Sequence, residues 1–126
     1  MVHKNAEHYE QVALHELLDM HRIVHFSVPN AAKRSYALMS FLKAEGFRAG
    51  VADLVIMSDP HCVGAMFPRP VFLELKTKER KKEKDGGCSE AQMLFAKDCE
   101  ELGYTYVVAY GFDNAVEILK GLGYGL

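Results

Sequence analysis

Stretches with helical periodicity alternate with short apolar runs along the chain, and this alternation constrains the fold more than any other feature. The helical pattern predicts helices at residues 7–20, 32–45, 89–102 and 112–122. The apolar runs predict strands at 23–28, 53–57, 71–75 and 104–110, with loops at 61–70 and 77–88. This order predicts an α/β fold, in which helices flank both faces of a central mixed β-sheet.

Length and composition favour a single globular domain. No linker or repeat divides the 126 residues, so residues 1–126 are expected to form one domain. The hydrophobic fraction of 49% and the charged fraction of 25% exclude a disordered or collagen-like chain. No apolar run reaches the ~18–20 residues of a membrane span. The first residues lack the apolar core of a signal peptide, so we expect an intracellular, cytoplasmic protein.

The strand at 71–75 continues into a lysine and carries charge in an apolar setting. Side chains alternate between the two faces of a strand, so Leu73 and Leu75 are expected to face the core. Glu74 and Lys76 then share the opposite face. Charged groups are costly to bury unpaired. The simplest interpretation is an ion pair at the edge of the sheet.

A second acid, Asp53, opens the neighbouring apolar run and favours another interpretation. If the two strands pair, Asp53 and Glu74 converge at one end of the sheet. Two carboxylates with open positions suit Mg²⁺ or Mn²⁺, which also take phosphate oxygens as ligands. A lysine beside such an ion can orient the attacking water or neutralise charge on phosphorus. The spacing of Asp53, Glu74 and Lys76 is common by chance, and alone it does not identify a site.

These motifs, in this order, are similar to those of a known family. The segments Gly46–Leu54 (GFRAGVADL) and Phe72–Lys76 (FLELK) resemble the VRR-NUC group of the PD-(D/E)xK nucleases, in its stand-alone phage and bacterial form. Further similar segments are Glu7–Gln11, Pro29–Asn30, Lys33–Ser35, Ser89–Gln92 and Gly103–Tyr104. The resemblance covers nearly the whole chain and implies a core like that of restriction endonucleases.

The resemblance implies metal-dependent cleavage of phosphodiester bonds in DNA, with Mg²⁺ or Mn²⁺ as cofactor. Asp53 and Glu74 would bind the metal, the Leu75 carbonyl would add a ligand, and Lys76 would serve the attacking water. An acid of the first helix would bind a second metal or a metal-bound water. Glu7 fits this role best because it lies four residues before Gln11, and Glu10 is the alternative.

Three of these residues have a structural interpretation as well. Glu7 or Glu10 can be a solvated acid that complements the helix dipole. Gln92 can close a capping box with Ser89, although the family pattern places this glutamine near the catalytic centre. Gln11 faces the site in the family pattern, and would then contact DNA.

A basic run follows the strand. Residues 76–85 hold six basic and three acidic side chains, a net charge of +3 in a chain of net charge −2. The run is either a solvated loop or a surface that grips DNA phosphates. The candidates for DNA contact are Lys78, Arg80, Lys81 and Lys82, with Lys33 and Arg34 as additions.

Histidines and cysteines are not spaced as metal ligands. Cys62, Cys88 and Cys99 lie far apart, and the six histidines form no H-E-x-x-H pattern, so no zinc site is predicted. His21 and His25, on either side of a predicted helix end, are expected at the surface.

Three functions remain open from the sequence. The first is an endonuclease that nicks or resolves branched DNA such as four-way junctions, acting as a homodimer because symmetric cleavage needs two active sites. The second is a catalytically silent DNA-binding module with the same fold. The third is a nuclease for duplex or single-stranded DNA without branch specificity. Phage origin in a bacterial host is an expectation from the resemblance, and no membrane or nucleotide cofactor is expected.

Overall fold

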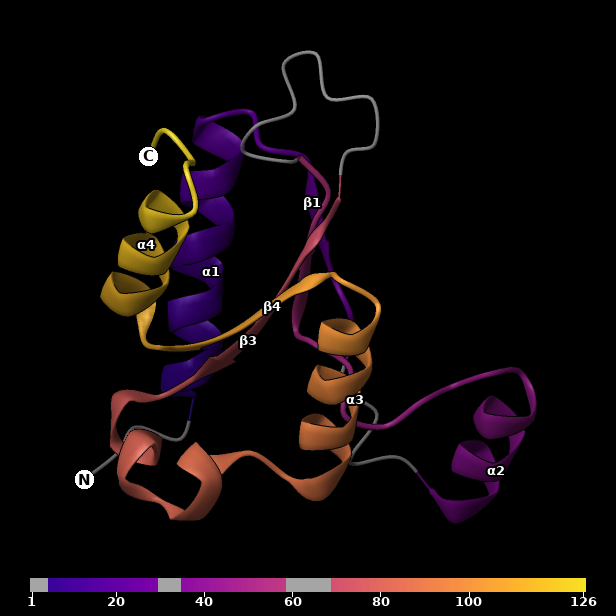
Figure 1. Ribbon diagram of the computed structural model, residues 1–126. Coiled ribbons are helices and arrows are strands. Elements are labelled where there is room, and N and C mark those ends of the chain that lie inside the picture. Colours follow the sequence, from indigo (N-terminus) through magenta and orange to yellow (C-terminus); the bar gives the residue numbers. More distant parts are fainter. Residues whose placement is uncertain (1–4, 30–34, 59–68) are drawn as a thin grey trace.

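The computed structural model describes residues 5–29, 35–58 and 69–126 and confirms the α/β fold (Figure 1). Its elements are α1 (Ala6–Met20), β1 (His25–Ser27), α2 (Tyr36–Ala44), β2 (Leu54–Ile56), β3 (Val71–Lys76), the 3₁₀-helices η1 (Lys78–Lys82) and η2 (Lys84–Gly87), α3 (Glu90–Glu101), β4 (Thr105–Tyr110) and α4 (Phe112–Gly121). Within these ranges no helix combines the length and the apolarity that crossing a bilayer requires.

One mixed sheet forms the centre of the molecule, in the order β1-β2-β3-β4. β2 pairs antiparallel with both β1 and β3, whereas β3 and β4 are parallel. β3 is therefore an interior strand, which explains why its six residues are almost all buried. α3 connects the two parallel strands, as a parallel pair requires.

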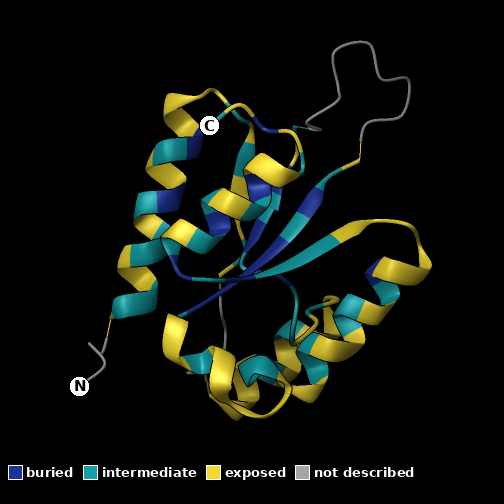
Figure 2. Cartoon of the chain, turned by 60° about the vertical axis from the view of Figure 1, so that its left-hand side comes forward, coloured by how far each residue is buried: buried dark blue, intermediate teal, exposed yellow. Residues whose placement is uncertain are grey.

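The hydrophobic core lies between one face of the sheet and the helices α1 and α4 (Figures 1 and 2). Leu73 and Leu75 of β3 are fully buried there, which confirms the predicted alternation of the strand. They pack in one cluster with Leu14 and Leu18 of α1 and Leu119 of α4. Each helix presents one apolar stripe to the sheet, and the sheet buries both.

The opposite face of the sheet is covered by α3. An edge-to-face ring pair joins Phe72 of β3 to Phe95 of α3, with ring centroids 5.6 Å apart. Phe95 also contacts Tyr106 of β4 at 5.9 Å. This aromatic cluster fixes α3 over β3 and β4. The helix therefore starts beside the end of β3 that carries Glu74 and Lys76.

The predicted helix at 32–45 is confirmed in part, but its predicted start is wrong. Ser35 is extended (φ −61°, ψ 155°), and its side chain accepts a hydrogen bond from the Leu38 N–H, so α2 begins at Tyr36. Residues 32–34 lie outside the described ranges. Leu38 and Phe41, two apolar residues of this helix, are 37% and 65% exposed. α2 contributes no buried residue because it lies away from the sheet (Figure 1).

The predicted loop at 77–88 is also wrong, because this segment forms η1 and η2. Hydrogen bonds to backbone carbonyls hold the segment: Arg80 Nη2 donates to Gly87 at 2.8 Å, and the Tyr110 hydroxyl donates to Gly86 at 2.7 Å. The segment therefore has a fixed shape next to the end of β3. Of the other predicted loop, at 61–70, residues 61–68 lie outside the described ranges.

Candidate functional site

The pairing of β2 with β3 brings the two predicted metal-binding acids together. Leu54 lies opposite Leu73 in the antiparallel register, and one further residue along each strand places Asp53 opposite Glu74. Opposed residues of an antiparallel pair point to the same face. On the other side of β2, the Asp53 carbonyl accepts a hydrogen bond from Val28 N–H at 2.9 Å, which extends the β1–β2 ladder to this residue. The structure thus contains the strand pairing on which the site hypothesis depended.

Glu74 and Lys76 are buried on the sheet face that α3 covers. Their exposed fractions are 3% and 2%, and Lys76 Nζ lies 3.8 Å from Glu74 Oε1. The predicted ion pair is therefore present, but its predicted place at the edge of the sheet is wrong, because β3 is an interior strand. Burial of this kind requires further partners, since two desolvated charges seldom compensate each other completely.

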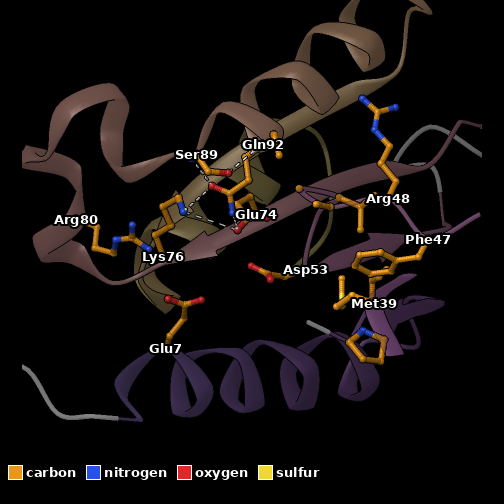
Figure 3. A pocket seen from close by; sticks show the side chains of 16 residues that line it. Glu7, Met39, Phe47, Arg48, Asp53, Glu74, Lys76, Arg80, Ser89 and Gln92 are labelled. Carbon is orange, nitrogen blue, oxygen red and sulfur yellow. Dashed lines mark hydrogen bonds and ion pairs between the residues drawn. The ribbon is translucent and has the colours of Figure 1, made fainter. Parts of the chain in front are cut away.

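Gln92 supplies those partners from the first turn of α3. Its Nε2 donates to Glu74 Oε1 at 2.8 Å, and its Oε1 accepts from Lys76 Nζ at 3.1 Å. The same Oε1 accepts from the backbone N–H of Ser89 at 2.9 Å, which closes a capping box. The two interpretations of Gln92 are therefore compatible: the capping box orients the side chain that contacts the buried charges (Figure 3).

The backbone at Gly50, three residues before Asp53, requires a glycine. Its φ of +84° favours glycine, and an added Cβ would lie 2.4 Å from the backbone carbon of Ala91. The loop before β2 therefore packs directly against the first turn of α3. This contact brings Asp53 and Gln92 to the same place from different parts of the chain.

Asp53 is held by the backbone of β3. Its Oδ2 accepts a hydrogen bond from the Leu75 N–H at 2.7 Å. The N–H and the C=O of one residue in an extended strand point to the same side. The Leu75 carbonyl, predicted as a metal ligand, therefore also points toward Asp53, where β2 no longer provides a strand partner.

A pocket of about 320 Å³ opens in front of these groups (Figure 3). Its polar lining comes from α1, the start of β2, β3, η1 and α3. The candidate residues that line it are Glu7, Asp53, Glu74, Lys76, Arg80 and Gln92. The pocket thus gathers polar side chains that are up to 85 positions apart in the sequence (Glu7 to Gln92).

Burial and mutual repulsion perturb the three carboxyl groups of the pocket. Desolvation, followed by the negative charge of Asp53, raises the pKa of Glu74 to about 8, although Lys76 opposes the shift. Desolvation also raises the pKa of Asp53, against the lowering effect of the Leu75 N–H. The pKa of Glu7 is raised by desolvation and by Asp53. A cation in the pocket would relieve this repulsion.

The donor set fits a divalent cation that prefers oxygen. Glu74 Oε2 is buried and has no hydrogen-bond partner among the described residues. Carboxylate oxygens of Asp53, Glu74 and Glu7, with the Leu75 carbonyl, are the hard ligands that Mg²⁺ and Mn²⁺ take. A buried acceptor without a partner is uncommon in proteins and calls for a missing group. We therefore regard the carboxylate pair as a candidate metal centre.

Two residues of α1 predicted at the site lie elsewhere. The Glu10 carboxylate accepts a hydrogen bond from the Phe112 N–H at the first turn of α4, and Gln11 lines a separate pocket beside β1. A helix turns about 100° per residue, so Glu10 and Gln11 point to opposite sides of Glu7. All three share one broad face of the helix, and it is the contacts with α4 and beside β1 that hold Glu10 and Gln11 away from the pocket. Glu7 is the acid of this helix that reaches Asp53.

The basic run is only partly at the pocket. Arg80 lines it, whereas Lys78 lies 3.9 Å from Asp113 and Lys81 lies over the Tyr110 ring at 6.0 Å. Lys82 is exposed at the end of η1. Lys33 and Arg34, the other predicted DNA contacts, lie outside the described residues.

Arg48 also lines the pocket and was not a sequence candidate. It forms an ion pair with Asp98 at 2.7 Å and stacks over the Phe95 ring at 5.3 Å. Its position between Gly46 and Gly50 of the glycine-containing motif was the available signal.

Comparison with solved structures identifies the fold. The chain superposes on a protein described as a VRR_NUC domain protein with a TM-score of 0.65. The two sequences are 20% identical over 96% of this chain and 90% of that chain. No family model and no curated protein sequence matches. The chain therefore has the fold of a VRR_NUC domain, which agrees with the fold that the sequence motifs implied.

The raised pKa of Glu74 predicts an unusual dependence of stability on pH. The folded protein holds a proton on Glu74 that the unfolded chain loses above pH 4.5. The free energy of unfolding should thus fall as the pH rises from about 4.5 to about 8, and then level off. The loss is on the order of 3 to 5 kcal/mol. Urea unfolding of metal-free protein at several pH values measures it.

The matched variants for this experiment are Glu74→Gln, which stays neutral, and Glu117→Gln, which removes an exposed acid of α4. The free energy of unfolding of Glu74→Gln should fall less with pH than that of wild type, whereas Glu117→Gln should show the same fall as wild type. Equal slopes in wild type and Glu74→Gln would show that Glu74 ionises normally in the folded protein.

Proposed function

We propose that this chain is a Mg²⁺- or Mn²⁺-dependent endodeoxyribonuclease that hydrolyses phosphodiester bonds in DNA. The observation that carries the proposal is the carboxylate pair of half-buried Asp53 and buried Glu74, with an unpartnered Glu74 oxygen, beside the buried Lys76. A paired acid and lysine at a perturbed site are typical of catalysis rather than of packing. The fold of a VRR_NUC domain protein supports the same class of enzyme.

The residues proposed to hold the ion are Asp53, Glu74 and Glu7, with the Leu75 carbonyl. When bound, such an ion lowers the pKa of a water ligand and neutralises charge on the phosphate. Burial raises the pKa of both carboxyl groups, and a bound cation would favour their ionised forms, so metal binding and the loss of protons would be linked.

Lys76 is the proposed partner of the attacking water. An ammonium group has three donors, and Gln92 takes one of them at 3.1 Å. The remaining donors can orient a water or a phosphate oxygen at the pocket wall. Gln92 restrains both Lys76 and Glu74, so it positions the reacting groups through a helix that is anchored by its own capping box.

We propose that the segment η1 and η2 binds the DNA backbone. Arg80 stands at the pocket, and its side chain is fixed by Glu83 at 3.0 Å and by Gly87. Lys78, Lys81 and Lys82 extend the positive surface outward from it. Such contacts give affinity without sequence specificity. They allow a protein of net charge −2 to bind DNA on one side.

Branched DNA, such as a four-way junction, is the proposed substrate, and a homodimer is the proposed active form. This part of the proposal rests on the resemblance of the motifs. Symmetric cuts at a junction require two active sites related by a two-fold axis. The alternative of a silent DNA-binding module is disfavoured because Asp53, Glu74 and Lys76 are all present and converge.

A cleavage assay tests the proposed activity. Labelled four-way junction, nicked duplex, linear duplex and single strand are incubated with Mg²⁺ or Mn²⁺, and with EDTA as control. We expect cuts at the branch that require the metal, and a loss of at least about 10³-fold in Glu74→Ala, because the carboxylate ligand is removed. Cuts in all substrates would support the nuclease activity and contradict the branch specificity. Binding without cleavage would favour the silent module.

A matched pair of variants on α1 tests the assignment of the helix acid. Glu7→Gln should lower the cleavage rate at least about tenfold, because the third carboxylate of the pocket is lost. Glu10→Gln should cleave at the wild-type rate and lose only about 0.5–1 kcal/mol of stability, since a neutral amide complements the α4 dipole less well. The reverse pattern in single-turnover rates would assign the role to Glu10.

The salt dependence of DNA binding tests the basic segment. The double variant Lys81→Ala/Lys82→Ala should bind more weakly and reduce the slope of log K against log salt by about 1 to 2, because fewer counterions are released. The control is Lys97→Ala/Lys120→Ala, which removes two exposed lysines of α3 and α4. Fluorescence anisotropy at several salt concentrations provides both slopes. An unchanged slope in the first variant would assign these lysines to a solvated surface.

A further inference from the structure

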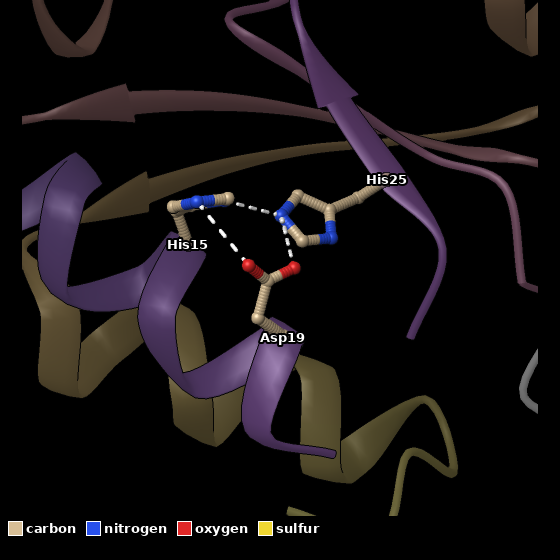
Figure 4. Close-up of side chains that lie close together, drawn as sticks. All are labelled: His15, Asp19 and His25. Carbon is tan, nitrogen blue, oxygen red and sulfur yellow. Dashed lines mark hydrogen bonds and ion pairs between the residues drawn. The ribbon is translucent and has the colours of Figure 1, made fainter. Parts of the chain in front are cut away.

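A second cluster of potential metal ligands lies at the other end of α1. His15 and Asp19 are one turn apart on this helix, and His25 reaches them from the edge strand β1 (Figure 4). The ligand atoms of the three side chains lie within 4.8 Å of one another. None of the three residues lines the pocket of Asp53 and Glu74. His15 and His25 line the separate pocket between α1 and β1.

The His25 ring is fixed with one nitrogen free for a ligand. Its Nδ1 lies 2.7 Å from the Ile23 carbonyl, which accepts only, so Nδ1 carries the proton. In the neutral ring Nε2 then has a lone pair, and it faces His15 and Asp19. The side chain is only 3% exposed, so the protein rather than solvent determines this orientation. A backbone carbonyl that orients the second nitrogen is typical of histidine ligands to metals.

In the contacts among His15, Asp19 and His25, hydrogen-bond acceptors outnumber the donors. His15 Nδ1 lies 2.7 Å from His25 Nε2, so the proton between them belongs to His15. The other nitrogen of His15 then faces Asp19 Oδ2 at 3.4 Å, and the second Asp19 oxygen lies 3.8 Å from His25 Nε2. A neutral His15 would direct a lone pair at a carboxylate. A cation between the three side chains would accept these lone pairs.

We propose that His15, Asp19 and His25 form a binding site for Zn²⁺ or a chemically similar divalent transition-metal ion. Two imidazole nitrogens and one carboxylate oxygen are ligands that such ions take, whereas Mg²⁺ prefers oxygen alone. The site goes beyond the proposed nuclease function and differs in ligand chemistry from the carboxylate pair. Three protein ligands leave a coordination position for water, on the side where His15 and Asp19 are 53% and 64% exposed.

Binding requires only a small movement of the exposed ligand. Two nitrogens on one tetrahedral Zn²⁺ are about 3.3 Å apart, given Zn–N bonds of about 2.0–2.1 Å, so His15 must move slightly away from His25. His15 can do so because its side chain is half exposed and His25 is the fixed partner. The bound ion would join the C-terminal half of α1 to an edge strand of only three residues. It would thus stabilise that strand.

Equilibrium binding of Zn²⁺ tests the proposal. The full chain is freed of metal, and Zn²⁺ is titrated against a chromophoric chelator, in wild type and in Glu74→Gln, where the carboxylate site is impaired. We expect one Zn²⁺ per chain with micromolar or tighter affinity in both backgrounds. We also expect a rise in Tm of at least about 4 °C at saturating Zn²⁺.

The variants distinguish this site from other ligands. His15→Ala and Asp19→Asn remove exposed side chains, and each should weaken Zn²⁺ binding at least about tenfold. His21→Ala, which removes a nearby exposed histidine outside the cluster, should bind as wild type. Wild-type affinity in His15→Ala would overturn the proposal, and so would the absence of stoichiometric Zn²⁺ binding. The Zn²⁺ titrations do not measure DNA cleavage, so their outcome neither supports nor contradicts the proposed nuclease function.

Discussion

The burial of a glutamate and a lysine on an interior strand is the constraint on which the rest of the structure depends. Glu74 and Lys76 alternate with the core leucines of β3, so the strand cannot enter the sheet without desolvating both charges. Their 3.8 Å ion pair is completed by Gln92, which contacts both. α3 must therefore begin at this point of the sheet. Gly50 is needed for the same reason, because any larger residue would displace the first turn of α3.

This arrangement costs stability and has a functional meaning. Asp53 lies opposite Glu74, and neither carboxylate ionises as easily as it would in water. A structure selected for stability alone would replace such a pair by apolar residues. A preformed pocket that holds three carboxyl groups and an unpartnered Glu74 oxygen is instead suited to a cation and a phosphate. We therefore infer that the desolvation and repulsion of these carboxyl groups, at the end of β2 and β3, are the basis of the proposed catalysis.

α1 shows how one helix serves several purposes through its periodicity. Its first turn directs Glu7 to the carboxylate pocket, while the next turn directs Glu10 to the N–H groups at the start of α4. Further along, His15 and Asp19 face β1. Oxygen donors gather at one end and imidazoles at the other, so the two proposed sites would select different ions. The sequence showed two acids within one turn of each other, and only the position of α4 separates their roles.

The sequence by itself determined the alternation of helices and strands and the shared face of Glu74 and Lys76, because periodicity is a local property of the chain. It also carried the capping box that orients Gln92, a feature of four consecutive residues. It did not determine that α2 lies away from the core, since an apolar stripe does not say what will cover it. The pairing of His15 with His25 likewise depends on the angle at which β1 returns along α1. Ten residues separate these histidines without a recognisable motif, and only the tertiary structure brings their ring nitrogens to 2.7 Å.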